Sequence, residues 1–384
     1  MTGLQRYNIL LIEDDSVQAE LVSRHLDSGD PHAHGVTFDV TWVTYLRDGI
    51  ERLADNDFDA VLLDLRLPDC QGLESIHRLL AQDSDASIIV LTGVDDADVA
   101  VQAAREGAQD YLKKSDLTPE HLIRSLRYAV EHRERRLTQR RLDATQREMK
   151  SAGEVQRMLL PTSAPIVPGL EIAGSYWPFD HVGGDYYDYF SADGRLSLVI
   201  ADVSGHGLAS ALVMAGLRRL LRSCVEMHDD VGEILSIVNR AVFEDTVGGR
   251  FVTAFFGSVD IETRELTYAS AGHPSYIVTP SGDATRLNSG NIPLGLLREE
   301  VMTSRPPVVL QPGEVLVLLT DGLYEAQNSN GELWGVDALL QTIHQHRNQT
   351  ADGIIAAVHA GVHAHCDPNP VNDDMALIVV KVAE

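Results

Sequence analysis

Four short motifs in the second half of the chain place aspartates beside glycines or at the edges of apolar runs. These motifs are Val182-Gly183-Gly184-Asp185, Asp202-Val203-Ser204-Gly205, Thr320-Asp321-Gly322 and Asn372-Asp373-Asp374. Rigid strand ends that carry oxygen ligands can hold two hard cations, which activate a water and clamp a phosphoryl oxygen. The glycines permit close backbone approach, so that a carbonyl can also serve as a ligand. The pattern predicts a two-metal site that acts on a phosphoryl group.

A second set of polar residues follows the apolar runs near the N-terminus. Glu13 and Asp14 follow Ile9–Ile12, Asp64 follows Ala60–Leu63, Thr92 follows Ile88–Leu91, and Lys114 follows Tyr111-Leu112. Converging carboxylates repel one another unless a cation joins them, and such an oxygen-rich cluster suits Mg²⁺. The hydroxyl and the ammonium group would neutralise a phosphoryl group on Asp64. The structural alternative is an acidic loop in an inert domain.

The periodicity of the apolar residues predicts the elements that position these groups. In residues 1–128 the buried runs alternate with amphipathic stretches such as Val17–Leu26 and Leu73–Leu80. This alternation predicts an α/β doubly wound, flavodoxin-like domain, whose strands end at a common edge. In residues 161–384 short β-rich runs and glycine turns are interrupted by helical stretches. An α+β domain with helices packed on sheets is expected there.

Residues 129–160 are predicted to form a helical linker between these domains. The helix starts earlier, with Thr118 as N-cap and Pro119 at the first helical position. Apolar residues recur seven apart, but arginines occupy the companion positions. A full coiled-coil seam is therefore not supported, and a shorter homodimer contact stays open.

The motifs IEDD, LLDLRLPD, VLTG and YLKK, in this order, resemble the receiver domain of two-component response regulators. The resemblance implies that Glu13, Asp14 and Asp64 bind Mg²⁺, and that Asp64 accepts phosphate from a histidine kinase or phosphotransfer protein. Thr92 and Lys114 would contact the phosphoryl group, and Tyr111 would be the switch aromatic. Ser115 stands where the family usually has proline, which leaves the loop conformation open.

The C-terminal motifs, with Gly272-His273-Pro274, Ile292–Gly295 and the Gln156-x-x-Leu159-Leu160-Pro161 segment, resemble the SpoIIE-like branch of the PPM protein phosphatases. The resemblance implies an αββα sandwich that binds two Mn²⁺ or Mg²⁺ ions and hydrolyses phosphoserine or phosphothreonine. The catalytic set would be Asp202, Asp321 and Asp373. Asp202 would bridge both metals, the Val203 carbonyl would serve one, and Asp321 and Asp373 would complete the other site.

Several further residues are assigned less specifically by the same resemblance. Asp185 would be a metal ligand or would lie beside one, and the roles of Asp188 and Asp374 stay open. His206 and His273 could be general acids or could make structural hydrogen bonds. Arg250 could contact the substrate phosphate, since a guanidinium fork fits phosphate. The last motif reads DDMA where the family usually ends in threonine.

These resemblances predict a response regulator whose output is dephosphorylation of a regulatory protein, controlled by phosphorylation of Asp64. The expected substrate is an anti-sigma factor antagonist of the STAS type. The alternative is a catalytically silent receiver–phosphatase-like adaptor that acts by binding proteins. A nucleotide cyclase is disfavoured, because Tyr186-Tyr187 replace the Glu-Phe of the GGDEF signature that GGDYYD superficially resembles.

The composition of the chain limits its expected binding partners and its expected cellular location. The net charge of −26 opposes binding to nucleic acid and to anionic lipid. No apolar run approaches the roughly 18 residues of a membrane span, and the N-terminus lacks the pattern of a signal peptide. The three cysteines are scattered and form no disulfide framework. We therefore expect a cytoplasmic protein with no nucleic-acid or membrane partner.

Overall fold

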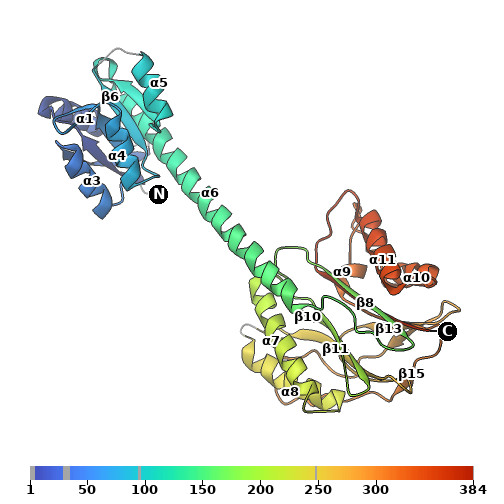
Figure 1. The fold of residues 1–384 in the computed structure, drawn as a ribbon. Coiled ribbons are helices and arrows are strands. Elements are labelled where there is room, and N and C mark those ends of the chain that lie inside the picture. Colours follow the sequence, from blue (N-terminus) through green and yellow to red (C-terminus); the bar gives the residue numbers. More distant parts are fainter. Residues whose placement is uncertain (1–4, 29–34, 94–96, 247–248, 384) are drawn as a thin grey trace. The chain divides into compact units, whose positions relative to one another are not determined.

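The computed structural model describes residues 5–28, 35–93, 97–246 and 249–383. The chain divides into two compact units, Met1–Thr145 and Gln146–Glu384 (Figure 1). The boundary lies within the long helix α6 (Pro119–Leu159). The separate linker at residues 129–160 stays a prediction. None of the described helices combines the length and apolarity needed to cross a bilayer.

The first unit contains a parallel five-stranded sheet in the order β2-β1-β3-β6-β7. Its strands are β1 (Gln5–Ile12), β2 (Val36–Val43), β3 (Ala60–Asp64), β6 (Ile88–Thr92) and β7 (Asp110–Lys113). Its helices are α1 (Ser16–Ser28), α3 (Leu46–Asp55), α4 (Glu74–Gln82) and α5 (Ala97–Arg105), with a small hairpin of β4 (Arg66–Leu67) and β5 (Cys70–Gln71). A short 3₁₀ turn, η1 (Lys114–Asp116), follows β7.

Both faces of this sheet are covered, because successive side chains of a strand point to opposite sides. Ile9 and Leu11 pack with α1 and the start of α6, whereas Leu10 and Ile12 pack with α3 and α4. The central strands β3 and β6 are buried at every residue, which is typical of parallel sheets. The predicted doubly wound fold is confirmed, and the strand ends bring Glu13, Asp64 and Thr92 to one edge.

The second unit is a sandwich of two antiparallel sheets. One sheet has the order β15-β12-β11-β10-β9, and the other has the order β14-β13-β16-β17-β8. The first comprises β9 (Tyr186–Ala192), β10 (Arg195–Val203), β11 (Val252–Asp260), β12 (Glu265–Ala271) and β15 (Val308–Val309). The second comprises β8 (Leu170–Trp177), β13 (Ser275–Val278), β14 (Ala284–Leu287), β16 (Val315–Leu319) and β17 (Met375–Val382).

Helices cover the outer faces of the sandwich, so the predicted αββα layers are confirmed (Figure 1). Helices α7 (Leu208–Val225) and α8 (Val231–Asp245) pack on the first sheet, and α10 (Val336–His346) and α11 (Ala351–Cys366) pack on the second. The short helix α9 (Asp321–Tyr324) follows β16. Alternate residues of β16 divide between the cores, with Leu316 and Leu318 facing the first sheet and Val317 facing the helices.

Candidate functional sites

An acidic cluster lies at the carboxyl edge of the parallel sheet. One carboxylate oxygen from each of Glu13, Asp14 and Asp64 lies within 4.8 Å of the others. Glu13 and Asp64 are buried, whereas Asp14 is exposed to solvent. This oxygen-rich set fits a Mg²⁺ site, because Mg²⁺ prefers carboxylate oxygens and waters as ligands. The sequence-predicted cluster is therefore brought together by the fold.

Lys114 joins two of these carboxylates. Its Nζ lies 2.6 Å from Glu13 Oε2 and 2.7 Å from Asp64 Oδ2. Burial alone would lower the pKa of Lys114, but hydrogen bonds with Asp64 and Glu13 raise it. Burial also raises the pKa of Glu13. The ammonium group thus lies where it can neutralise negative charge on Asp64.

The other residues predicted for this edge differ in exposure. Thr92 is buried at the end of β6, and Tyr111 is half-buried on β7. Ser115 lies within η1, where its hydroxyl donates to Asp116 Oδ1 at 2.9 Å. The segment in which Ser115 replaces the usual proline thus forms a 3₁₀ turn, and Lys114 at its start contacts the cluster. The roles of Thr92 and Tyr111 in switching stay predictions.

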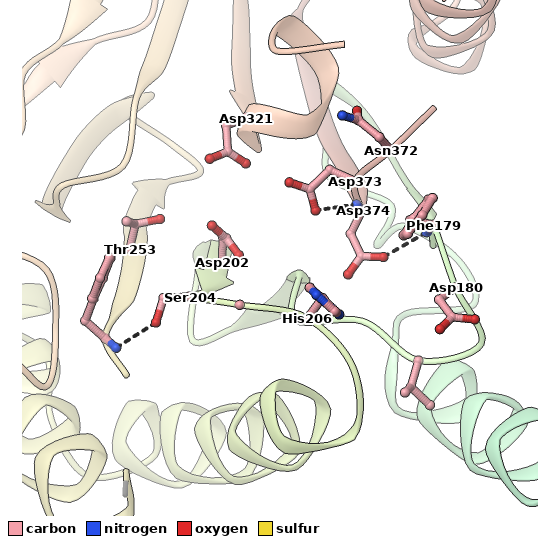
Figure 2. Close-up of a pocket in the computed structure, with 13 residues that line it drawn as sticks. Phe179, Asp180, Asp202, Ser204, His206, Thr253, Asp321, Asn372, Asp373 and Asp374 are labelled. Carbon is pink, nitrogen blue, oxygen red and sulfur yellow. Dashed lines mark hydrogen bonds between the residues drawn. The ribbon is translucent and has the colours of Figure 1, made fainter. Parts of the chain in front are cut away.

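The second site is a pocket of about 440 Å³ in the sandwich of the second unit. The described residues that line it include five aspartates and no lysine or arginine: Asp180, Asp202, Asp321, Asp373 and Asp374. Figure 2 shows the carboxylates of Asp202, Asp321 and Asp373 around one space. They come from β10, the start of α9 and the loop before β17. Residues far apart in sequence therefore form a single carboxylate-lined pocket.

The buried carboxylates of this pocket repel one another, which raises their pKa values. Burial and the charges of Asp321 and Asp373 raise the pKa of Asp202 to about 7. Burial and neighbouring Asp202 raise the pKa of Asp185, which is 2% exposed. Asp185 Oδ2 is buried and has no hydrogen-bond partner among the described residues. A carboxylate-rich set with an unpartnered buried oxygen fits hard cations such as Mg²⁺ or Mn²⁺.

Close backbone contacts explain the glycines of the motifs. A Cβ on Gly184 would lie 2.7 Å from the Val203 carbonyl oxygen. A Cβ on Gly322 would overlap the Asp374 carbonyl oxygen, and one on Gly183 would overlap the Asp374 side chain. Only a residue without a side chain fits at these positions. The glycines thus allow Asp185 and Asp321 to approach the C-terminal aspartates.

Asp374 organises the loop that precedes β9. Its Oδ1 accepts a hydrogen bond from Phe179 N at 2.9 Å, and its Oδ2 accepts one from Gly184 N at 2.9 Å. Both oxygens therefore have backbone donors, and the loop that carries Asp185 is fixed to the loop before β17. Asp374 and Asp373 therefore have different contacts. The carboxylate of Asp373 accepts a hydrogen bond from the Asp374 amide at 2.8 Å.

The last turns of α6 contact the same loop. Gln156 is 6% exposed; its Nε2 donates to the Gly183 carbonyl at 2.6 Å and its Oε1 accepts from Gly183 N at 3.1 Å. A Cβ on Gly153 would overlap the His181 carbonyl oxygen. The sequence motif included Gln156 without assigning it a role. Only the fold shows that this side chain binds the backbone next to Asp185.

Asp188 has different surroundings from Asp185, the other aspartate of its motif. It is fully buried, and Arg222 of α7 donates to its two oxygens at 2.7 and 2.8 Å. The Tyr186 hydroxyl donates to it at 2.8 Å. These contacts give Asp188 an ion-pairing role between β9 and α7. Sequence spacing alone did not reveal Arg222 as its partner.

Three further candidates take different places around the pocket. His206 is exposed and lines the pocket, whereas His273 is 2% exposed and does not line it. Arg250 is half-buried and precedes two lining residues, Phe251 and Thr253, without lining the pocket itself. A contact between Arg250 and phosphate stays a prediction. Asp180 and Thr253 line the pocket but were not predicted, since neither stands in a recognisable motif.

Comparison with known families accounts for both units. Residues 192–383 match the family described as Stage II sporulation protein E (SpoIIE), which is half of the chain. The chain belongs to the SpoIIE family. Residues 9–127 match the response regulator receiver domain, so a receiver precedes the SpoIIE-family phosphatase domain. The matched SpoIIE segment contains Asp202, Asp321 and Asp373 and begins after Asp185.

Two curated relatives of the SpoIIE-family chain have similar sequences. Phosphoserine phosphatase RsbU of Bacillus subtilis is 28% identical over 62% of this chain and 72% of that protein. Protein IcfG of Synechocystis is 28% identical over 61% of this chain, but the match spans only 41% of that protein.

Two solved structures resemble the SpoIIE-family domain. The RsbU and RsbW domains of a Mycobacterium tuberculosis protein are 29% identical, with a TM-score of 0.51 over 59% of this chain and 63% of that one. The SiaA-PP2C domain of Pseudomonas aeruginosa is 22% identical, with a TM-score of 0.56 over 64% of this chain and 98% of that one. The second likeness concerns the fold alone.

Proposed function

We propose that this chain is a metal-dependent phosphatase that hydrolyses phosphoserine or phosphothreonine on a regulatory protein. The observation that carries the proposal is the pocket lined by Asp202, Asp321 and Asp373, in which no lysine or arginine is found among the described lining residues. A phosphate group would be repelled by this pocket unless cations were bound. A cation-loaded carboxylate site is the arrangement that phosphoryl-transfer enzymes use.

The residues that would hold the cations are Asp202, Asp321, Asp373 and Asp185, with the Val203 carbonyl as a further oxygen ligand. Bound Mn²⁺ or Mg²⁺ would lower the pKa of a coordinated water and offset the charge of the substrate phosphate. The protein keeps the carboxylates at fixed positions through the strand ends and the contacts of Asp374. His206 lines the pocket, where its imidazole can donate a proton to the departing seryl oxygen.

The substrate proposal comes from the relatives. RsbU of Bacillus subtilis is named a phosphoserine phosphatase. We extend this substrate class to the present chain, and we propose an anti-sigma factor antagonist of the STAS type as the phosphoprotein. We also propose that phosphorylation of Asp64, by a histidine kinase or phosphotransfer protein, controls the activity in a direction that is left open.

Hydrolysis of a phosphoserine peptide tests the activity. We expect turnover with Mn²⁺, loss of turnover with a chelator, and a loss of about 100-fold or more in Asp202→Asn, because the nucleophilic water depends on the cation. Asp229→Asn, which neutralises an exposed aspartate outside the pocket, is the matched control. Absence of turnover with a peptide and with a phosphorylated STAS-type protein would instead support the silent adaptor.

A further inference from the structure

The His273 imidazole bridges the two sheets of the sandwich. It lies in the connection between β12 and β13, and it is 2% exposed. Its Nε2 lies 2.9 Å from the carbonyl oxygen of Leu319, the last residue of β16. Its Nδ1 lies 2.9 Å from Thr253 Oγ1 on β11. The ring thus links a strand of the second sheet to a pocket-lining hydroxyl of the first.

These two contacts determine where the protons lie. A carbonyl oxygen can only accept a hydrogen bond, so the Nε2 atom of His273 must carry the proton. Burial lowers the pKa of His273 to about 4, so the ring is neutral near pH 7 and Nδ1 is an acceptor. The Thr253 hydroxyl must therefore donate its only proton to Nδ1. Its oxygen can then only accept a hydrogen bond from the pocket.

Thr253 lies in the pocket, where an oxygen that only accepts hydrogen bonds limits which groups can bind beside it. It lines the pocket and pairs directly with Asp202 in the β10–β11 register. Figure 2 shows its hydroxyl oxygen on the side of the pocket that contains Asp202 and Asp321. Phosphate oxygens of a substrate dianion carry no proton and cannot donate to this oxygen. A water molecule can donate to it.

We propose that Thr253 is a positioning residue whose oxygen accepts a hydrogen bond from the attacking water, and that His273 fixes the direction of that hydrogen bond. This inference rests on the proposed phosphatase function. The Thr253 oxygen holds one proton of the water, so that a lone pair of the water is directed toward phosphorus. It also disfavours a phosphate oxygen at the same position. His273 acts through Thr253, without contact with the substrate.

A tautomer measurement tests the hydrogen-bond chain independently of turnover. Nitrogen NMR of the full chain with ¹⁵N-labelled histidine, assigned by His273→Gln, should show a neutral ring protonated at Nε2 from about pH 5.5 to about pH 8.5. A ring protonated at Nδ1, or a titration in this range, would overturn the inference. This result stands whether or not the wild type hydrolyses a phosphopeptide.

Kinetics of two variants test the role of the Thr253 hydroxyl. Thr253→Val removes the acceptor, and we expect kcat to fall about tenfold with little change in KM, the size of one lost hydrogen bond. Thr253→Ser should recover most of that loss. Equal kcat values for Thr253→Val and Thr253→Ser, with a wild type that turns over, would overturn the inference. A wild type without turnover would count against the proposed function instead.

A third variant, His273→Gln, is tested by the binding of phosphate. Its amide can still donate to the Leu319 carbonyl but leaves the Thr253 proton free to point into the pocket. We expect inorganic phosphate, measured by calorimetry with Mn²⁺ present, to bind several-fold more tightly to His273→Gln than to the wild type. Unchanged or weaker phosphate binding in a folded variant, verified by circular dichroism, would contradict the proposed direction of the hydrogen bond.

Discussion

The ionised form of Asp202 is unfavourable in the pocket when no cation is bound. Its pKa is raised to about 7 by burial and by the charges of Asp321 and Asp373. A carboxyl group with a higher pKa in the folded state binds more protons when folded than when unfolded. The free energy of unfolding therefore falls as the pH rises from about 4 to about 7. The contribution of Asp202 to stability is complete at a pH below its pKa in the unfolded chain, and it is lost at a pH above its pKa in the folded protein.

Removal of the Asp202 charge should weaken this pH dependence. With a chelator present, we expect Asp202→Asn to reduce the fall in unfolding free energy between about pH 4 and about pH 7. The reduction is at most about 4 kcal/mol, because one pKa unit corresponds to about 1.4 kcal/mol. Urea denaturation followed by tryptophan fluorescence measures it, with Asp229→Asn as control. Identical slopes in Asp202→Asn and wild type would contradict the explanation.

The ion pair between buried Asp188 and partly exposed Arg222 predicts a different phenotype. Arg222→Met leaves a fully buried carboxylate without its cation, and we expect a loss of about 2–4 kcal/mol in unfolding free energy. Mn²⁺ affinity should change little, since Asp188 faces α7 and does not line the pocket. Denaturation and calorimetry measure the two quantities. Arg219→Met on the exposed side of α7 is the control, and equal stability of both variants would refute the prediction.

At the scale of elements, hydrogen bonds hold the end of α6 against the loop before β9. Gln156 binds both backbone groups of Gly183, and Asp374 binds the amide of Gly184. Asp185 follows directly. A displacement of the last turns of α6 must therefore break two hydrogen bonds or move the segment that ends in Asp185. This contact joins the last turns of α6 to the segment that contains Asp185.

Gly153→Ala should disturb this contact between α6 and the loop before β9. The added methyl group would overlap the His181 carbonyl oxygen, so the helix or the loop must shift. We expect weaker Mn²⁺ binding, measured by calorimetry, and at least tenfold lower turnover, since small displacements of positioned groups cost large factors. Gly216→Ala on α7 has open space around the new methyl group and is the matched control. Wild-type Mn²⁺ affinity in Gly153→Ala would contradict the coupling.

At the scale of the molecule, α6 begins in the receiver and ends in the SpoIIE-family domain. Its first turns bury Leu122, Ile123 and Leu126 in the receiver core, and its last turns contain Gln156. The two units therefore share one continuous element. We propose that a change of the receiver that moves the start of this helix is transmitted to the loop of Asp185.

Phosphorylation of Asp64 should therefore change the phosphatase rate. We expect a change of at least about threefold in wild type when a small-molecule phosphodonor is added, and no change in Asp64→Asn. Asp57→Asn, at an exposed aspartate, should respond as the wild type does. The phosphopeptide assay with and without the donor measures this. Equal rates with and without donor in wild type would reject control by phosphorylation.

The sequence by itself predicts the elements of both units and most of the site carboxylates, because burial and turn formation depend on neighbouring residues. Alternation of buried runs and amphipathic stretches identified the doubly wound unit, and carboxylates at the ends of apolar runs identified Glu13, Asp14 and Asp64. The aspartates at 202, 321 and 373 were found in the same way, and the pocket brings all three together. Strand ends are readable in sequence because burial and turn formation act on neighbouring residues.

The partners of these residues were decided only by the tertiary structure. Asp185 and Asp188 stand three residues apart in one motif, yet one lies beside Asp202 and the other pairs with Arg222. Side chains of a strand alternate between its faces, and which helix covers each face depends on packing across the whole sandwich. For the same reason, the contacts of Gln156 with Gly183 and of His273 with Thr253 join residues that no sequence spacing connects.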